Sequence, residues 1–272
     1  MTFKGAIKLI RPLNLVIVIF ATLVSFAVVR SFEDPVQFLK FVVPLLLLAA
    51  FSNCLNDCAD AELDKQAHPS RPIAKGEVSV SASKWLSVVL GFLTLVSAML
   101  YTKAVTRWVL IAGFLLAIFY DILLKKVAFV GNLVVSILTS FPFLLMWLET
   151  GNWSLMWFPV LCATVYNLGR EAVKDMEDFN VDSKFGYKTL PFFLGERGIR
   201  IYVSLLLIVL ILFTVIAFLK VFRNPVFLVL LSCSFLYLII RVATEKSFSR
   251  LSGVFKNFMI FTLLGITLGG VL

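Results

Sequence analysis

Residues 38–64 read FLKFVVPLLLLAAFSNCLNDCADAELD, a long apolar run that leads directly into a cluster of carboxylates. Asp57, Asp60 and Asp64 are spaced i, i+3 and i+7, so a helix would place them on one face. Like charges on one helix face repel by about 0.2–0.5 kcal/mol per pair in water and by more where water is scarce. The same spacing returns 118 positions later, at Asp175, Asp178 and Asp182. Two such arrangements predict that the protein binds a cation.

The composition around this stretch is that of an integral membrane protein. Hydrophobic residues make up 60% of the 272 residues and charged residues only 15%, with a mean hydropathy of +0.98, whereas about a quarter of the residues in a soluble domain are charged. A helix needs about 20 apolar residues to cross a membrane. Nine windows qualify: 12–29, 38–56, 85–101, 108–124, 129–148, 155–173, 199–219, 225–240 and 253–272. We therefore expect a single all-α domain over residues 1–272, built as a bundle of nine transmembrane helices.

The distribution of basic residues predicts the orientation in the membrane. Of the 25 Lys and Arg residues, nineteen fall at the N-terminus or around the connections after the second, fourth, sixth and eighth windows. The other side holds only six: Arg30, Lys40, Lys103, Arg107, Lys220 and Arg223. By the positive-inside rule, the N-terminus and both Asp clusters are cytoplasmic and the C-terminus is external. The net charge of +9 then reflects topology and attraction to anionic headgroups, and we expect no nucleic-acid partner.

Each Asp cluster is followed by a similar loop, which indicates two related helix-loop units. Arg71-Pro72-Ile73 and Thr189-Leu190-Pro191 lie at the same offset from their clusters, and parallel repeats of this kind place a site at the interface of two halves. Mg²⁺ usually bridges one or two protein carboxylates to a substrate phosphate. Two such clusters in an apolar chamber suit a hydrophobic tail that carries a pyrophosphate, ionised with the help of the metal. Arg71 could grip the phosphate oxygens at two points, although an arginine on its own in such a loop is more often a topology determinant.

Two motifs carry a resemblance to a known family. The run NDCADAELD at 56–64 with SRPI at 70–73, and the run DFNVD at 178–182 with Gly186 and TLP at 189–191, resemble the two Asp signatures of the UbiA-type intramembrane prenyltransferases. The resemblance covers essentially the whole chain. It implies Mg²⁺-dependent ionisation of a prenyl pyrophosphate and transfer of the prenyl group to a lipid or aromatic acceptor. It also implies metal ligands at Asn56, Asp60, Asp64, Asp178 and Asp182, with Asp57 and Asp175 as further ligands or as supporting residues. Of these, Asp60, Asp64, Asp178 and Asp182 would be catalytic.

The same resemblance suggests which residues bind substrate. These are Arg11, Asn14, Asn53, Arg71, Tyr120, Lys125, Arg170 and Lys174. Tyr120 and Lys125 are one residue further apart than is usual in the family, so Lys126 could take the place of Lys125. The sequence around Arg170 and Lys174, together with Arg11 and Asn14, resembles the archaeal branch that geranylgeranylates geranylgeranylglyceryl phosphate. Aromatic acceptors such as 4-hydroxybenzoate, a naphthoate or a tocopherol-type ring, and haem, remain open alternatives.

Other classes of protein fit the sequence less well. A cation-coupled secondary transporter would carry its acids near the membrane midplane and would use helix pairs broken at matching positions, and we expect neither here. A non-catalytic lipid-binding scaffold would not need two Asp clusters. Cys54, Cys58 and His68 could form a soft-metal site, but hard carboxylates dominate that neighbourhood. We expect all four cysteines to be reduced thiols packed between helices.

Overall fold

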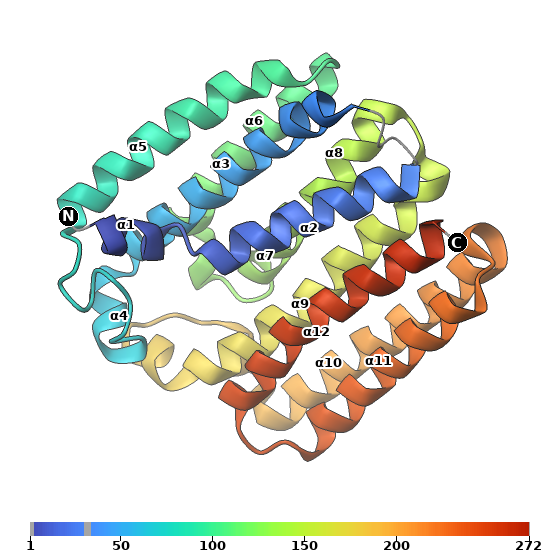
Figure 1. Ribbon diagram of the computed structural model, residues 1–272. Helices are drawn as coiled ribbons and strands as arrows, with labels where there is room; N and C mark the ends of the chain where they lie inside the picture. Colours follow the sequence, from blue (N-terminus) through green and yellow to red (C-terminus); the bar gives the residue numbers. More distant parts are fainter. Residues whose placement is uncertain (1–2, 30–33, 272) are drawn as a thin grey trace. The chain divides into compact units, whose positions relative to one another are not determined.

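A computed structural model describes residues 3–29 and 34–271, so Arg30 and Leu272, which enter the predictions above, lie outside the described residues. Secondary structure in these two ranges is helical apart from one isolated bridge between Val127 and Lys188 (Figure 1). The helices are α1 Phe3–Leu9, α2 Pro12–Val29, α3 Pro35–Ala59, α4 Ala61–Ala67, α5 Val80–Ser97, α6 Ala104–Ile122, α7 Val130–Thr139, α8 Phe141–Thr150, α9 Trp153–Lys184, α10 Leu190–Ala217, α11 Pro225–Thr244 and α12 Phe248–Val271. Three short turns of other helix types follow α5, α6 and α10: η1 Ala98–Leu100, η2 Leu124–Lys126 and η3 Phe218–Phe222. The all-α prediction is confirmed.

Local capping chemistry explains where several helices begin. Asp34 precedes α3, and its carboxylate accepts a hydrogen bond from the Val36 N–H at 2.8 Å. Ser79 plays the same part for α5, where its hydroxyl accepts from the Ala82 N–H at 3.2 Å. Asn224 caps α11 by accepting from the Val226 N–H at 2.9 Å. Each cap satisfies a backbone donor that the first turn leaves unpaired.

The predicted count of nine membrane-spanning helices is wrong for the part of the chain that the structure describes. Seven helices are long and apolar enough to cross a membrane, or eight if α7 and α8 together form one span. The window 129–148 is not one straight helix, because α7 and α8 are bent by 55° around Ser140, where Pro142 falls in the first turn of α8. The window 155–173 lies inside α9, which is 32 residues long and ends in a strongly charged segment. This single bent pair among the described residues does not contradict our expectation, which concerned helix pairs broken at matching positions.

The described chain divides into two compact units. The first contains residues 3–22 and 34–125. In it α5 packs closely on α3, because Gly91 carries no side chain where a Cβ would lie 3.1 Å from the ring of Phe114 and 3.2 Å from that of Phe51. Leu9 of α1 is fully buried against Cys54, Ile73 and Val78, so α1, α3 and the loop after α4 share one apolar cluster.

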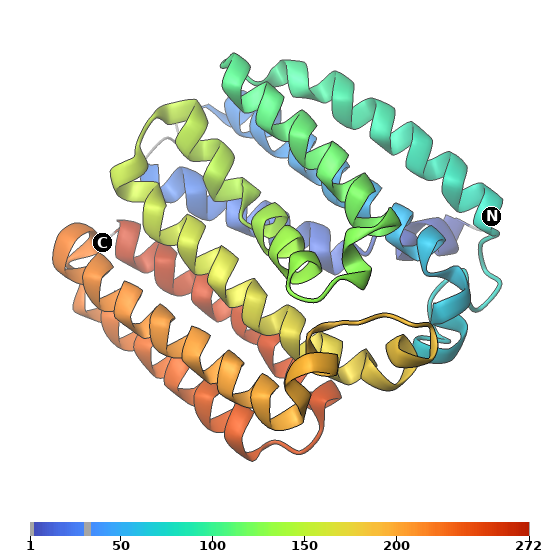
Figure 2. The ribbon, with the colours of Figure 1, turned by 180° about the vertical axis from the view of Figure 1, so that it is seen from behind.

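The second unit contains residues 23–29 and 126–271, and α9 is its centre. Helices α7, α8, α10 and α12 all contact α9, and Figure 2 shows α10 and α12 running alongside it. Tyr166 of α9 is buried and donates its hydroxyl to the backbone carbonyl of Phe255 in α12 at 2.6 Å. The second Asp cluster therefore lies on the helix that packs against four others in this unit.

Candidate active site

The first Asp cluster lies at a bend rather than on one uninterrupted helix. Helix α3 ends at Ala59, Asp60 caps both that end and the start of α4, and Asp64 lies within α4. The backbone hydrogen bonds continue through the bend, since the Asp60 N–H donates to the Asn56 carbonyl at 2.9 Å and the Asp64 N–H donates to the Asp60 carbonyl at 2.8 Å. The three carboxylates therefore stay close together, although the single helix face that we expected is broken at Asp60.

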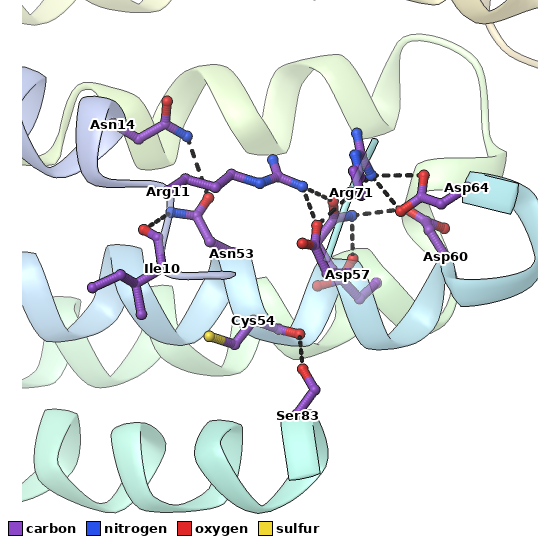
Figure 3. Close-up of polar contacts among 12 residues, drawn as sticks. Ile10, Arg11, Asn14, Asn53, Cys54, Asp57, Asp60, Asp64, Arg71 and Ser83 are labelled. Atoms are coloured by element: carbon purple, nitrogen blue, oxygen red, sulfur yellow. Dashed lines mark hydrogen bonds and ion pairs between the residues drawn. The ribbon is translucent and has the colours of Figure 1, made fainter. Parts of the chain in front are cut away.

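Two arginines approach these carboxylates from other parts of the chain (Figure 3). Arg11 donates to Asp57 and, at 3.2 Å, to the side-chain oxygen of Asn56. One terminal nitrogen of Arg71 donates to both oxygens of Asp64 at 2.7 Å and lies 3.7 Å from Asp57. The side chains of Asp57 and Asp64 are each only 2% exposed. Both buried carboxylates are thus paired with a cation, as burial of a charge requires.

The backbone at Arg11 adopts an unusual conformation that directs its side chain to α3. Its φ of 51° lies in the left-handed region, which a residue other than glycine rarely adopts, and the following Pro12 disfavours the ordinary helical conformation at this position. Asn53 stabilises the bend by donating to the Ile10 carbonyl at 3.0 Å, and Asn14 donates to Asn53 at 3.4 Å. Three predicted substrate-binding residues, Arg11, Asn14 and Asn53, therefore lie side by side.

Lys125, and not Lys126, joins the first cluster. Its ammonium nitrogen lies 2.5 Å from Asp60 and 3.5 Å from Asp121, with only 7% of the side chain exposed. Lys126 instead stacks over the ring of Tyr187 in the second unit, 5.3 Å from the ring centre. Of the two lysines, Lys125 is the one that lies against the first cluster. Tyr120 is partly buried on the last turn of α6, directly before Asp121.

The loop between α4 and α5, which carries Arg71, is tied back to α1. Lys8 donates to both carboxylate oxygens of Glu77 at 2.9 and 2.8 Å, and this hydrogen bond lowers the pKa of Glu77 below its ordinary value. Gly76 provides the positive φ of 76° that the turn before Glu77 requires. Burial raises the pKa of Asp64 above its ordinary value, and the facing guanidinium of Arg71 opposes that shift.

The second Asp cluster lies in the second unit, on the uninterrupted helix α9. Asp175 accepts a hydrogen bond from the side-chain amide of Asn132 in α7 at 2.8 Å. Arg170 pairs with its neighbour Glu171, whose side chain is buried. The C-terminal end of α9 closes on Asp182, since the backbone N–H of Tyr187 donates to the Asp182 carbonyl at 2.9 Å. The predicted residues Asp178 and Lys174 lie on the same helix.

The side chains of the first cluster are hard oxygen donors, and its carboxylates are paired with protein cations. Among the described residues, no group of three or more His, Cys, Asp or Glu side chains is gathered closely enough to hold a metal ion. The available donors are the amide oxygen of Asn56 and the carboxylates of Asp57, Asp60 and Asp64. Oxygen donors of this kind suit Mg²⁺. The donor set therefore fits magnesium, provided that the carboxylates exchange protein cations for the metal.

Sequence reasoning missed two residues that contact the clusters and a third, Glu77, that holds the loop carrying Arg71. Asp121 accepts from Asn56 at 2.9 Å, Asn132 donates to Asp175, and Glu77 anchors Lys8. Asp121 was the easiest to find, because an acid at the end of an apolar window is a functional suspect by default. Asn132 and Glu77 gave no comparable signal.

Comparisons with known proteins identify relatives across nearly the whole chain. A profile of the UbiA prenyltransferase family matches residues 17–264. Digeranylgeranylglyceryl phosphate synthase of Methanothrix thermoacetophila is 35% identical over 210 residues, which cover 76% of this chain and 77% of that protein. A solved structure of digeranylgeranylglyceryl phosphate synthase in membranes covers 98% of both chains with a TM-score of 0.78 and 25% identity. A UbiA homologue from Archaeoglobus fulgidus, solved with DMAPP and Mg²⁺, shares the fold with a TM-score of 0.69 at 16% identity, covering 96% of this chain and 99% of that one.

Proposed function

This chain belongs to the UbiA prenyltransferase family, and from that premise we propose that it transfers a geranylgeranyl group from geranylgeranyl pyrophosphate to geranylgeranylglyceryl phosphate with Mg²⁺ as cofactor. The acceptor is supported by the name of the relative that is 35% identical over three quarters of the chain. The metal is supported by the UbiA homologue solved with DMAPP and Mg²⁺ and by the oxygen donors of the Asp clusters.

The observation that carries this proposal is the charge balance of the first cluster. Four carboxylates, those of Asp57, Asp60, Asp64 and Asp121, meet three cations, those of Arg11, Arg71 and Lys125. The cluster therefore has one negative charge in excess, and its arginine and lysine side chains could also bind the oxygens of a second anion. A divalent metal and a pyrophosphate arriving together would satisfy both halves of the cluster.

The side chains divide into two roles in this proposal. Asn56, Asp60 and Asp64 hold the metal on the side of the first cluster, while Asp57 keeps Arg11 and Arg71 in place from its position between them. Arg11, Arg71 and Lys125 bind the pyrophosphate oxygens and stabilise the charge that develops on the leaving group. Asp178 and Asp182 supply the second set of ligands, Asp175 supports them through Asn132, and Arg170 and Lys174 add positive charge. Tyr120, Asn14 and Asn53 complete the substrate-binding set.

The reaction then follows from bond polarity. The allylic carbon–oxygen bond of the prenyl pyrophosphate breaks, and both electrons leave with the pyrophosphate. A hydroxyl oxygen of the acceptor captures the allylic cation and gives its proton to the released pyrophosphate. Bound Mg²⁺ would neutralise charge on the leaving pyrophosphate. The apolar helices exclude water, which would otherwise capture the cation. The residues named above need only bind, orient and neutralise.

We also propose that the N-terminus and both Asp clusters face the cytoplasm and that the C-terminus is external, within one catalytic domain over residues 1–272. The proposal is supported by the excess of Lys and Arg around the loops that adjoin the clusters. On the cytoplasmic side, the site would be accessible to dissolved Mg²⁺ and to the charged headgroups of its substrates.

The purified protein in lipid nanodiscs tests the proposed reaction. With geranylgeranyl pyrophosphate, geranylgeranylglyceryl phosphate and Mg²⁺, we expect digeranylgeranylglyceryl phosphate and pyrophosphate in equal amounts by mass spectrometry. EDTA should stop the reaction and added Mg²⁺ should restore it. Product formed with 4-hydroxybenzoate but not with the glyceryl phosphate would contradict the proposed acceptor, and turnover that persists in EDTA would contradict the metal.

A further inference from the structure

Asp121 has no assigned part in binding or chemistry, yet its side chain is only 2% exposed at the end of the apolar helix α6. A buried carboxylate is costly unless it is paired. One oxygen of Asp121 accepts from the side-chain amide of Asn56 at 2.9 Å and lies 3.5 Å from the ammonium nitrogen of Lys125. We infer that Asp121 is a positioning residue, which holds Lys125 and Asn56 ready for the pyrophosphate and its metal.

The contacts around Asp121 close into a ring of four side chains. The amide of Asn56 also donates to Asp60 at 3.0 Å, and Lys125 reaches the other oxygen of Asp60 at 2.5 Å. Because Asp60 and Asp121 both accept from the amide nitrogen of Asn56, the amide oxygen is turned the other way, towards Arg11 at 3.2 Å. Asp121 therefore also fixes which face of Asn56 is offered to the cluster.

Within this ring, Asp121 would hold Lys125 in place when Asp60 becomes a ligand of the metal. An oxygen of Asp60 that serves a metal can no longer pair fully with Lys125, so Lys125 needs another anion to stay in place. Asp121 is the second carboxylate that the structure shows within 4 Å of it. An ammonium has three donors, so one bond to Asp121 leaves two for phosphate oxygens. All four residues of the ring belong to the first compact unit.

A double-mutant cycle on binding tests this inference, which rests on the proposed role of Lys125. The probe is geranylgeranyl S-thiolopyrophosphate, which does not ionise readily, with Mg²⁺ and the full-length protein in nanodiscs. Asp121→Asn should weaken its binding about tenfold, the scale of a lost charge-assisted hydrogen bond. In the Lys125→Met background the same change should cost less than about twofold, because residues that act through one another are not additive.

Two further variants separate positioning from packing. Asp121→Glu keeps the negative charge, and it should recover binding to within about threefold of the unmodified protein because a carboxylate again faces Lys125. Thr94→Val removes a different buried polar group, one that bonds only within α5, and it should leave binding unchanged. If Asp121→Asn does not fold, Asp121→Ser takes its place in the cycle.

The outcomes distinguish this inference from the proposed function. The positioning role is overturned if Asp121→Asn weakens probe binding equally in the unmodified and the Lys125→Met backgrounds. It is also overturned if Asp121→Glu binds the probe as weakly as Asp121→Asn. Either result leaves the proposed role of Lys125 intact. If Lys125→Met alone binds the probe normally, the proposed role of Lys125 itself fails. Non-additive losses with recovery by Asp121→Glu support the inference.

Discussion

Arg71 pairs with the buried carboxylate of Asp64, which would be costly to bury without a cation beside it. It donates to both oxygens of Asp64, whose side chain is only 2% exposed. Burial raises the pKa of Asp64, and the guanidinium of Arg71 lowers it. A carboxyl with a raised pKa makes the folded state bind more protons than the unfolded state, so its contribution to stability is present at low pH and is lost as pH rises through the folded pKa.

Removing Arg71 should therefore destabilise the protein in a pH-dependent way. Without Mg²⁺ and at pH 8, we expect Arg71→Ala to lower the free energy of unfolding by about 3 kcal/mol, because it leaves Asp64 buried and unpaired. At pH 5 the deficit should shrink, since Asp64 can take up a proton once its pKa has risen further. Thermal unfolding in detergent at both pH values measures this. Lys65→Ala, which breaks an exposed pair with Glu62, is the control and should change little at either pH.

Asp60 joins its two neighbouring helices and contacts both Asn56 and Lys125, which makes it the most informative single ligand to remove. Asp60→Ala should lower kcat by at least about 100-fold, the scale of a lost electrostatic stabiliser, with a thermal unfolding midpoint close to that of the unmodified protein. Glu62→Ala is the matched control two positions away, since that side chain is 75% exposed, and it should keep normal turnover. Near-normal kcat in Asp60→Ala would rule out its metal role.

At the scale of elements, α1 and the loop that carries Arg71 behave as one piece of structure. Leu9 is buried against Ile73 and Val78, and Lys8 holds Glu77. These contacts link the loop to the helix that leads into Arg11. The bend at Arg11 and the position of Arg71 are thus set by the same small cluster.

Loosening this link should expose the loop to protease. Trypsin does not cut between Arg71 and Pro72, so the cleavable bond is the one between Lys75 and Gly76. We expect Lys8→Ala to speed cleavage at that bond several-fold in nanodiscs, as gel analysis over time would show, because local opening controls proteolysis. Lys4→Ala, on the exposed side of α1, should leave the rate unchanged. Equal rates in both variants would mean that the ion pair does not restrain the loop.

The elements that sequence predicted well are those whose signal is local. Within the described residues, each apolar window falls mainly on helix, because a span must be apolar over about 20 consecutive residues. The bend at Ser140 was missed because hydrophobicity alone does not show whether a long apolar segment forms one straight helix or two. Pro142 marks the start of the second helix, since proline is tolerated in a first turn. The end of the window 155–173 was placed too early, because α9 continues as one helix through the charged residues that follow it.

The candidate site was predictable in its residue types and not in its pairings. The spacing of the aspartates indicated both clusters, and Arg71 and Lys125 were identified with them. The pairing of Asn56 with Asp121 spans 65 positions, and that of Asn132 with Asp175 spans 43. Contacts of this kind depend on how helices pack against each other, which no local pattern records.

At the scale of the whole molecule, charge asymmetry predicts how the chain is inserted. A fluorescent protein fused to the N-terminus should fluoresce, and alkaline phosphatase fused to the C-terminus should be active, because each reporter works on only one side of a bacterial inner membrane. Cysteine introduced at Lys75 should be protected from an impermeant thiol reagent in intact cells, whereas cysteine at Lys103 should react. Labelling at Lys75 from outside would reverse the proposed orientation.

Lys125 and Lys126 are consecutive residues with separate attachments, one to Asp60 in the first unit and the other to the ring of Tyr187 in the second. We therefore expect the length of the chain just before them to be constrained. A single residue inserted after Leu124 would shift both lysines by one position, so that neither ammonium could reach its partner without rebuilding the turn. Relatives should consequently vary in the composition of this turn far more readily than in its length.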